Sequence, residues 1–257
     1  MKIINCYNLY HLGDCIESLH FLTNATKCND VHFNFLCNSA YHTQLQEFIN
    51  NYNIYLVSEF NTPEVPIDTW IGSYNYGQIC RESDILYGTD SDQGTFFLVL
   101  SQILSKMMNI TCPFSTKDDM IYNQDVLQEV CIHNELYDCL FINSQNLSIP
   151  FPNFEQECKL LIERLKLKNK KFITTRTMLD VPCTMDYNLS VAQIGKLSKN
   201  VKSIIAVNTG PLHLCMNRWT IPRVEKFIIW SPAETFSYGS NFQTVRSLGE
   251  INENHIV

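Results

Sequence analysis

The sequence of 257 residues contains no long hydrophobic run that would mark a membrane span or a secretory leader. A transmembrane helix needs about 20 consecutive apolar residues, and no stretch of the chain approaches that length. The first six residues, MKIINC, have the pattern of a strand and lack the apolar region and cleavage site of a signal peptide. We therefore expect a cytoplasmic protein without a transmembrane segment.

Positive charge is also scarce, and it is not clustered. The chain has 19 Lys and Arg against 26 Asp and Glu, a formal net charge of -7 with no Lys/Arg run. Because neutralisation of phosphates supplies most of the affinity for duplex nucleic acid, this balance argues against nucleic acid as a partner.

Cofactor and metal motifs are missing as well. The eleven cysteines include no C-x-x-C pair, and several of them lie inside apolar runs, as buried free thiols do in a reducing compartment. The histidines show no ligand spacing with Cys or carboxylates, so we expect no metal site. Neither G-x-G-x-x-G nor a P-loop pattern occurs, which argues against a redox dinucleotide or an ATPase. We expect no bound cofactor.

What the sequence does contain is an alternation of strand and helix patterns, with 45% hydrophobic residues spread along the whole chain. The predicted strands cover residues 2–9, 31–37, 53–57, 69–71, 138–143, 171–175, 203–207 and 226–230. The predicted helices cover residues 15–25, 41–52, 96–108, 154–167, 190–199 and 211–217, and the segment 58–94 is loop-rich. The helix 96–108 is apolar almost all round and is therefore expected to be buried, whereas the helix 154–167 turns Glu163 and Arg164 to solvent.

The alternation breaks near residues 128–137 and then restarts, which predicts two domains, 1–130 and 131–257. Strands joined by helices of this length form parallel β-α-β units, so the fold class is α/β with two Rossmann-like halves. Ligands of such sheets bind beyond the carboxyl ends of the strands. The pattern leaves open whether the last residues, 240–257, pack back across the cleft between the two halves.

Two strand-to-helix turns, one in each half, are the candidate ligand-binding sites. Gly13 and Asp14 follow the first strand, and Asn208, Thr209, Gly210 and Pro211 follow the strand 203–207. A glycine lets a ligand approach the backbone, and a helix start offers free N–H groups to an anion. The alternative is that these residues serve only the geometry of the turns.

These two turns resemble the motifs of family 9 glycosyltransferases, the heptosyltransferase group. Residues 11–16, HLGDCI, are similar to the N-terminal glycine-aspartate turn of that family. Residues 207–214, VNTGPLHL, are similar to its C-terminal motif, in which Ser/Thr-Gly-Pro is followed by a hydrophobic residue and His. The resemblance implies a GT-B fold, in which two Rossmann-like domains face each other across a cleft. It also implies that the N-terminal domain binds the acceptor and the C-terminal domain the nucleotide-sugar donor.

On this resemblance Asp14 is the general base of an inverting transfer, with Gly13 and His11 beside it in the acceptor pocket. It takes the proton of an acceptor hydroxyl, and that oxygen attacks the anomeric carbon on the face opposite the leaving group. A nucleoside diphosphate leaves as a stabilised anion, so no second carboxyl is required, in contrast to glycosidases. The alternatives are that Asp14 is a helix cap or dipole partner and that His11 is a plain turn residue.

The resemblance assigns Asn208, Thr209, Gly210, Pro211 and His213 to the donor phosphates, which the helix start and hydroxyls would hold without a metal. His213 alternatively forms hydrogen bonds in the core. The chain departs from the family in having Asn208 where an Asp is usual, and in lacking Lys or Arg after the strand 138–143.

Arg176 is the best substitute for the missing cation, and its alternative is an ordinary solvated arginine. Aromatic residues of the N-terminal half would stack on sugars or serve packing: Tyr7, Tyr10, Trp70, Tyr74 and Tyr76.

The sequence thus predicts an inverting glycosyltransferase of glycan biosynthesis. It would move a hexosyl or heptosyl group from a nucleotide-diphosphate donor to a hydroxyl of a glycan or lipid-linked acceptor. Two alternatives remain, a sugar-nucleotide epimerase or hydrolase on the same fold, and a non-catalytic carbohydrate- or nucleotide-binding protein.

Overall fold

The computed structural model describes residues 1–61, 65–70, 73, 93–116, 136–145, 151–217, 219–231, 240–252 and 256. The chain divides into two compact units, Met1–Gln128 and Glu129–Val257. Each unit is built on a parallel β-sheet of its own.

The sheet of the first unit has the strand order β3-β2-β1-β4, and all of its pairings are parallel. Its strands are β1 (Lys2–Asn8), β2 (Val31–Cys37), β3 (Ile54–Val57) and β4 (Ile67–Asp68). The alternation in β2 places Phe33 and Phe35 in the core, as strand periodicity predicts. The short strand predicted at 69–71 is observed earlier in the sequence, since β4 ends at Asp68, and residue 71 falls outside the described residues. Thr69 follows β4 and donates both its N–H and its hydroxyl to the Tyr7 carbonyl oxygen of β1.

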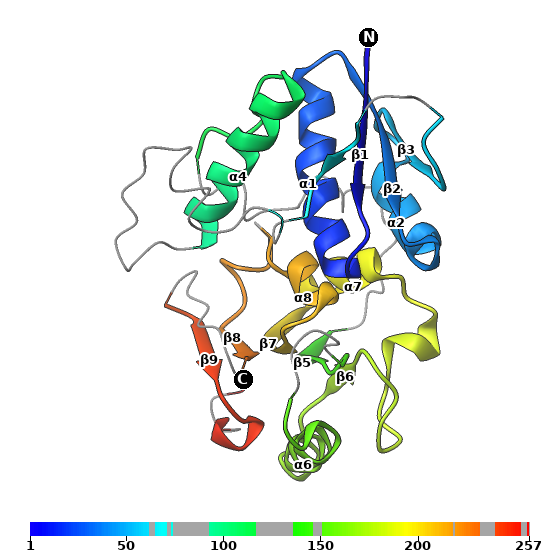
Figure 1. Ribbon diagram of the computed structural model, residues 1–257. Coiled ribbons are helices and arrows are strands. Elements are labelled where there is room, and N and C mark those ends of the chain that lie inside the picture. The colour runs from blue at the N-terminus through cyan, green and yellow to red at the C-terminus, as the bar shows by residue number, and fades with distance from the viewer. Residues whose placement is uncertain are drawn as a thin grey trace. The chain divides into compact units, whose positions relative to one another are not determined.

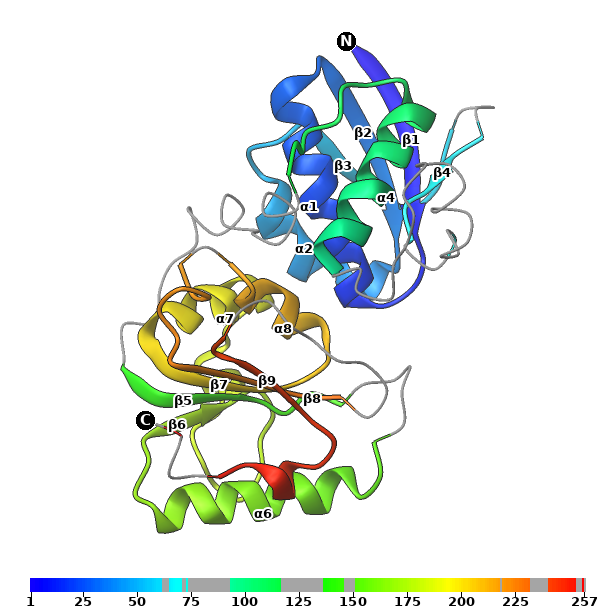
Figure 2. The same cartoon turned by 90° about the vertical axis from the view of Figure 1, so that its left-hand side faces the viewer.

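The helices of this unit are α1 (Leu12–Cys28), α2 (His42–Ile49) and α4 (Gln93–Met108), with a 3-10 turn at Ser39–Tyr41. Figures 1 and 2 both show α1 and α4 side by side. The helix predicted from residue 15 begins three positions earlier, at Leu12. The expectation that the helix 96–108 is buried is only partly right, since Lys106 and Met107 are exposed and Met107 keeps 51% of its surface in solvent.

The sheet of the second unit has the order β6-β5-β7-β8-β9 and is also entirely parallel. Its strands are β5 (Tyr137–Ile142), β6 (Phe172–Thr174), β7 (Val201–Val207), β8 (Lys226–Trp230) and β9 (Phe242–Val245). The edge strand β9 is not among the sequence predictions. Only Val245 of its four residues is buried, so its sequence lacks the apolar pattern of the inner strands.

Helices cover both faces of this sheet, with α7 (Val191–Leu197) and α8 (Gly210–Cys215) on one face and α6 (Phe154–Leu167) on the other (Figure 2). The bounds predicted for α6 are those observed. Ser190 caps α7 as its type suggests, with Oγ accepting from the Gln193 N–H at 3.2 Å. Short 3-10 turns occur at Thr184–Tyr187 and Ser198–Asn200, and the second ends the helix that was expected to run to residue 199.

Helices α7 and α8 touch at Gly195. A Cβ built on Gly195 would lie 2.8 Å from Leu214 Cβ and 3.1 Å from the Leu214 carbonyl oxygen. This contact positions α8, and with it the turn that precedes it, because only a residue without a side chain fits between the two helices.

The segment after β9 folds onto α6. Arg164 donates to the carbonyl oxygens of Leu248 at 2.6 Å and Ile251 at 3.3 Å, so the expectation that Arg164 faces solvent is wrong. Glu157 accepts from the Ser247 hydroxyl at 2.9 Å and from the Gly249 N–H at 3.2 Å. Residues 240–252 and 256 contribute β9, the 3-10 turn Leu248–Glu250 and the buried Ile256 to this unit.

A search of the described residues finds no helix with the length and apolar character needed to cross a bilayer.

Candidate functional site

The residues predicted from the two motifs lie in turns that follow interior strands of the two sheets. In a parallel sheet all strands end at the same edge, so the turns after β1, β2 and β4 share one edge of the first sheet. The turns after β5, β6, β7, β8 and β9 share one edge of the second.

Asp14 lies in the first turn of α1, where its side chain is half-buried. Its Oδ2 accepts a hydrogen bond from the His11 backbone N–H at 3.2 Å, which closes the first turn of the helix. Gly13 is buried in the same turn and His11 is exposed. Asp14 therefore caps the start of the helix through Oδ2, while no described residue donates a hydrogen bond to its Oδ1. One oxygen remains available for a proton.

A buried polar network fixes this turn from beneath. Asn8 Nδ2 donates to Ser18 Oγ at 3.0 Å, and Ser18 Oγ donates to the Asp14 carbonyl oxygen at 3.0 Å. The Thr69 hydroxyl lies 2.8 Å from the same Ser18 oxygen. The network ties the starts of α1 and of the segment after β4 together, and sequence reasoning missed all three residues. The signal in the sequence was Ser18 itself, a polar residue on the otherwise apolar face of α1.

An aromatic pair and a second carboxylate lie at the same edge. The rings of Tyr10 and Trp70 are stacked, with centroids 3.5 Å apart and planes 18° apart. Asp68 accepts from the Trp70 N–H at 2.9 Å and from the Ser73 hydroxyl. Burial, and after it the Asp68 carboxylate, raise the pKa of Tyr7. Of the predicted aromatic residues, Tyr74 and Tyr76 fall outside the described residues.

Tyr41 comes from the turn after β2 and was also missed by sequence reasoning. Burial raises the pKa of Tyr41 first, and the neighbouring Cys15, Asp14 and Cys37 groups raise it further. Its hydroxyl is therefore a neutral neighbour of the Asp14 carboxylate.

The turn after β7 has a different composition. Thr209 is the N-cap of α8 with extended backbone (φ -147°, ψ 169°), and its hydroxyl donates to the Val207 carbonyl oxygen at 3.2 Å. Gly210 begins the helix, Pro211 stands in its first turn as its missing N–H suggests, and no acidic residue is present there. Asn208 and His213 are half-buried on either side.

The two motif glycines do not need their conformational freedom. Among the described glycines none has a positive φ, so Gly13 and Gly210 are not required by a left-handed backbone. This removes the principal steric reason for the interpretation that the glycines serve only turn geometry.

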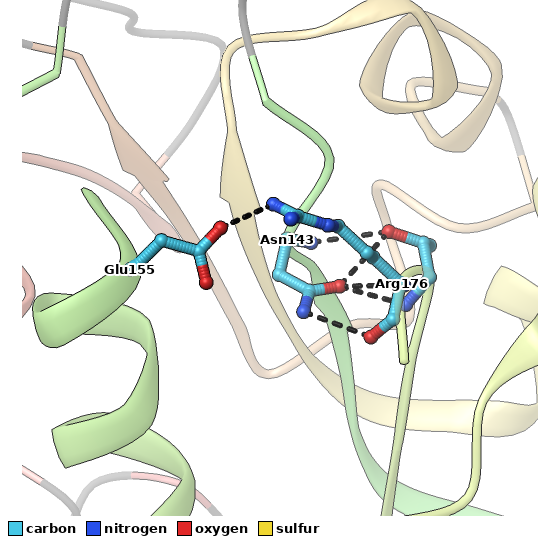
Figure 3. Close-up of polar contacts among 4 residues, drawn as sticks. Asn143, Glu155 and Arg176 are labelled. Atoms are coloured by element: carbon cyan, nitrogen blue, oxygen red, sulfur yellow. Dashed lines mark hydrogen bonds and ion pairs between the residues drawn. The ribbon is translucent and has the colours of Figure 1, made fainter. Parts of the chain in front are cut away.

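Arg176 follows β6, and β5 separates β6 from β7 in the sheet. Its guanidinium Nη1 pairs with Glu155 Oε1 from the first turn of α6 at 2.6 Å (Figure 3). Asn143, at the end of β5, holds the backbone of Arg176 from both sides, accepting from its N–H at 2.8 Å and donating to its carbonyl oxygen at 3.0 Å. The side chain remains 41% exposed, so Arg176 is an ion-paired residue at the edge that contains Thr209.

The part of the chain that the structure describes contains no group of three or more His, Cys, Asp or Glu able to hold a metal ion.

The whole chain aligns with E. coli heptosyltransferase WaaC in its structure with ADP-2-deoxy-2-fluoro heptose. The TM-score is 0.56 at 12% identity, over 100% of this chain and 98% of that one. The same enzyme with ADP gives 0.55 at 11% identity, over 100% and 95%. The chain has the GT-B fold of the heptosyltransferases.

A third similar structure is the iron-containing dodecameric glycosyltransferase TibC of enterotoxigenic E. coli H10407, with a TM-score of 0.54 and 10% identity over 94% of this chain and 62% of that one. No family model and no curated protein matches the sequence. The resemblance to family 9 glycosyltransferases is thus confirmed for the fold, and the roles of the individual residues stay predictions.

Proposed function

We propose that the protein is an inverting, metal-independent glycosyltransferase that moves a sugar from a nucleoside-diphosphate donor to a hydroxyl of a glycan or lipid-linked acceptor. The observation that carries the proposal is the pairing of a GT-B fold over the full chain with a glycine turn at the end of an interior strand in each sheet. The similar WaaC structures contain ADP and an ADP-sugar analogue, which supports a nucleotide-sugar donor for this chain.

The electrostatics of the helix starts support placing the donor diphosphate at the second turn. The start of α1 contains the Asp14 carboxylate and that of α6 contains Glu155 and Glu157, whereas the first turn of α8 contains no acid. An anion is stabilised by free N–H groups and repelled by a carboxylate. The first turn of α7 also lacks an acid, but there Ser190 Oγ already accepts from the Gln193 N–H, so the start of α8 is better suited to a diphosphate. The Thr209 hydroxyl would turn from the Val207 carbonyl oxygen to the phosphate, with Asn208 and His213 flanking it.

Asp14 is proposed as the general base. Its Oδ2 is fixed by the His11 N–H, which orients the carboxylate, and its Oδ1 would take the acceptor proton. The C–O bond to the acceptor forms as the bond to the diphosphate breaks, and the electron pair leaves with the diphosphate. A general base of this kind contributes about 10² to 10⁴ in rate.

The test is to incubate the full chain with nucleotide sugars and candidate acceptors, and to measure both nucleoside-diphosphate release and the anomeric configuration of the product. The proposal expects release that depends on the acceptor, and a product of inverted configuration. Retained configuration would refute the inverting mechanism.

The same assay separates the two alternatives. Consumption of the nucleotide sugar without acceptor would indicate an epimerase or hydrolase. Binding of nucleoside diphosphate with no consumption under any condition would indicate a non-catalytic binding protein.

A further inference from the structure

Two free cysteines of the first unit meet at the end of β2. Cys37 is the last residue of that strand, and Cys15 follows Asp14 near the start of α1. Cys15 Sγ donates to the Asn8 carbonyl oxygen at 3.5 Å, and Asn8 is the residue of β1 that pairs with Cys37 in the sheet. The two thiols are also hydrogen-bonded to each other. The sheet register and the position of α1 therefore hold the two sulfurs side by side.

The two thiols differ in acidity. The hydrogen bond from Cys15 lowers the pKa of Cys37, although burial acts in the opposite direction. The same hydrogen bond, and after it burial, raise the pKa of Cys15. Cys37 is therefore the thiol that ionises first, with the Cys15 S–H as its donor. Because the thiolate is the nucleophilic form of cysteine, reaction with an oxidant begins at Cys37.

Burial restricts the oxidants that can reach this pair. Cys15 is fully buried and Cys37 is 4% exposed, so a small molecule such as a hydroperoxide is better suited than a bulky disulfide. The Cys15 thiol, already in contact with Cys37, is in position to resolve the oxidised sulfur before it is oxidised further.

We propose that Cys37 and Cys15 form a redox modification site whose oxidant is a hydroperoxide. The Cys37 thiolate attacks one peroxide oxygen and becomes a sulfenic acid, while the other oxygen leaves and is protonated to water or an alcohol. The Cys15 sulfur then attacks the Cys37 sulfur, the S–O bond breaks, and the hydroxyl leaves as water with the Cys15 proton. Two thiols have given two electrons to the peroxide, and a dithiol reductant restores them by thiol–disulfide exchange.

The pair lies in the same neighbourhood as the proposed base. Tyr41, from the turn after β2, has Asp14, Cys15 and Cys37 among its neighbours. Formation of the disulfide takes the Cys15 sulfur from the Asn8 carbonyl oxygen and bonds it to β2. The first turn of α1, which contains Asp14, is then tied covalently to the end of that strand.

A second pair of neighbouring cysteines provides an internal comparison. Cys28 is exposed at the end of α1, and its Sγ lies 3.9 Å from the carbonyl oxygen of Thr111, the residue before Cys112. Burial raises the pKa of Cys28, and the neighbouring Cys112 raises it further. Exposure thus favours oxidation of this pair, whereas thiolate stability favours Cys37 and Cys15.

The experiment treats the reduced full chain with one molar equivalent of hydrogen peroxide. Remaining thiols are alkylated in denaturant, and the peptides are mapped by mass spectrometry with and without dithiothreitol. We expect a cross-linked peptide that joins Cys15 to Cys37 and disappears on reduction. The absence of this cross-link, or a product confined to Cys28 and Cys112, would overturn the proposal.

Serine variants test the order of the two steps. Cys15→Ser keeps a hydroxyl donor beside Cys37 but cannot resolve it, so dimedone added with denaturant should trap a sulfenic acid on Cys37. Cys37→Ser should give no such adduct on Cys15, and an equal yield there would refute Cys37 as the attacking thiol. Cys6→Ser is the matched control, since Cys6 is equally buried and its Sγ lies 3.8 Å from the Asn34 carbonyl oxygen. It should form the disulfide as the wild type does. The wild-type map decides the proposal if a variant does not fold.

The consequence for turnover rests on the proposed function, whereas the disulfide map does not. Oxidation should lower acceptor-dependent turnover by about 10- to 100-fold, as displacement of a catalytic group by about 1 Å does, and dithiothreitol should restore it. Cys37→Ser should keep its turnover in peroxide. A fully formed disulfide with unchanged turnover would overturn the link to Asp14. A disulfide that forms in a chain without transferase activity in either redox state would overturn the proposed function alone.

Discussion

The turns after β1 and after β7 follow interior strands of two parallel sheets, yet they are built in opposite ways. The first leads into a helix of 17 residues whose first turn contains Asp14, and the second leads into a helix of 6 residues whose first turn contains proline and no acid. The first helix start is capped by the protein's own carboxylate, whereas no acidic residue lies in the first turn of the second. This difference supports our proposal of a base at one turn and a diphosphate at the other.

The two turns are also anchored differently. Buried hydrogen bonds among Asn8, Ser18 and Thr69 fix the first, and close packing of α7 against α8 at Gly195 fixes the second. Substitutions at the two turns should therefore separate chemistry, ligand binding and stability.

Asp14 should give the largest effect, because the proposed mechanism adds the role of base to the helix cap that its carboxylate already provides. Asp14→Asn keeps an oxygen that can accept from the His11 N–H but removes the base, so we expect turnover to fall by about 10²- to 10⁴-fold with little change in melting temperature. Asp14→Ala should lose the same turnover and also about 0.5–2 kcal/mol of stability through the lost cap. Steady-state rates and thermal melts measure the two quantities.

Glu17→Gln removes a carboxylate from the same helix one turn later and serves as the control. If Asp14→Asn transferred sugar at the wild-type rate, Asp14 would be a capping residue only.

Thr209 tests the second turn. Thr209→Val keeps the shape and removes the hydroxyl. Because that hydroxyl would exchange its bond to the Val207 carbonyl oxygen for one to a charged phosphate, nucleoside-diphosphate affinity should fall by about 3- to 10-fold. Thr209→Ser retains the hydroxyl and should bind nearly as the wild type. Calorimetric titration decides the point, and equal affinities for the Val and Ser variants would contradict a phosphate contact.

Gly195 tests the packing that supports this turn. Gly195→Ala places a methyl group 2.8 Å from Leu214 Cβ, and overpacking of this kind costs about 1–3 kcal/mol, measurable by urea unfolding. Gly249→Ala is the control, since its Cβ would meet only Ser247 Oγ at 3.2 Å on an exposed turn. A Gly195→Ala protein as stable as the control would mean that α7 and α8 can separate freely.

The smallest effect is expected at the Arg176–Glu155 pair. Both side chains are substantially exposed, at 41% and 50%, so Glu155→Gln should change stability by less than about 1 kcal/mol. It should also free Arg176 and tighten diphosphate binding slightly. Glu163→Gln, an exposed change of the same charge on α6, is the control, and identical binding in the two variants would exclude Arg176 from the donor site.

The sequence predicted those elements whose local pattern is strong. The amphipathic α6 has its predicted bounds, Ser190 caps α7, and the alternation of β2 places Phe33 and Phe35 in the core. In these cases periodicity and capping are properties of neighbouring residues, so they can be read without the tertiary structure.

The remaining features depend on partners distant in the sequence. The polar edge strand β9 is stabilised by pairing with β8 rather than by an apolar pattern, and Arg164 points to the carbonyl oxygens of Leu248 and Ile251, which no helical pattern reveals. The same holds for the candidate site. Its glycine turns were visible as motifs, but the Asp68 carboxylate and the Glu155 partner of Arg176 were not.

The attachment of the segment after β9 to α6 has a consequence for synthesis of the chain on the ribosome. The core of the second unit joins Cys139 and Leu161 to Leu248 and Ile256, so it closes only after the chain has been translated as far as Ile256. Until then the apolar face of α6 is uncovered, and Arg164 and Glu157 lack the hydrogen bonds that they form with residues 247–251. The first unit draws on residues made earlier, so nascent-chain folding should proceed in two separate stages, with the second unit maturing after the first.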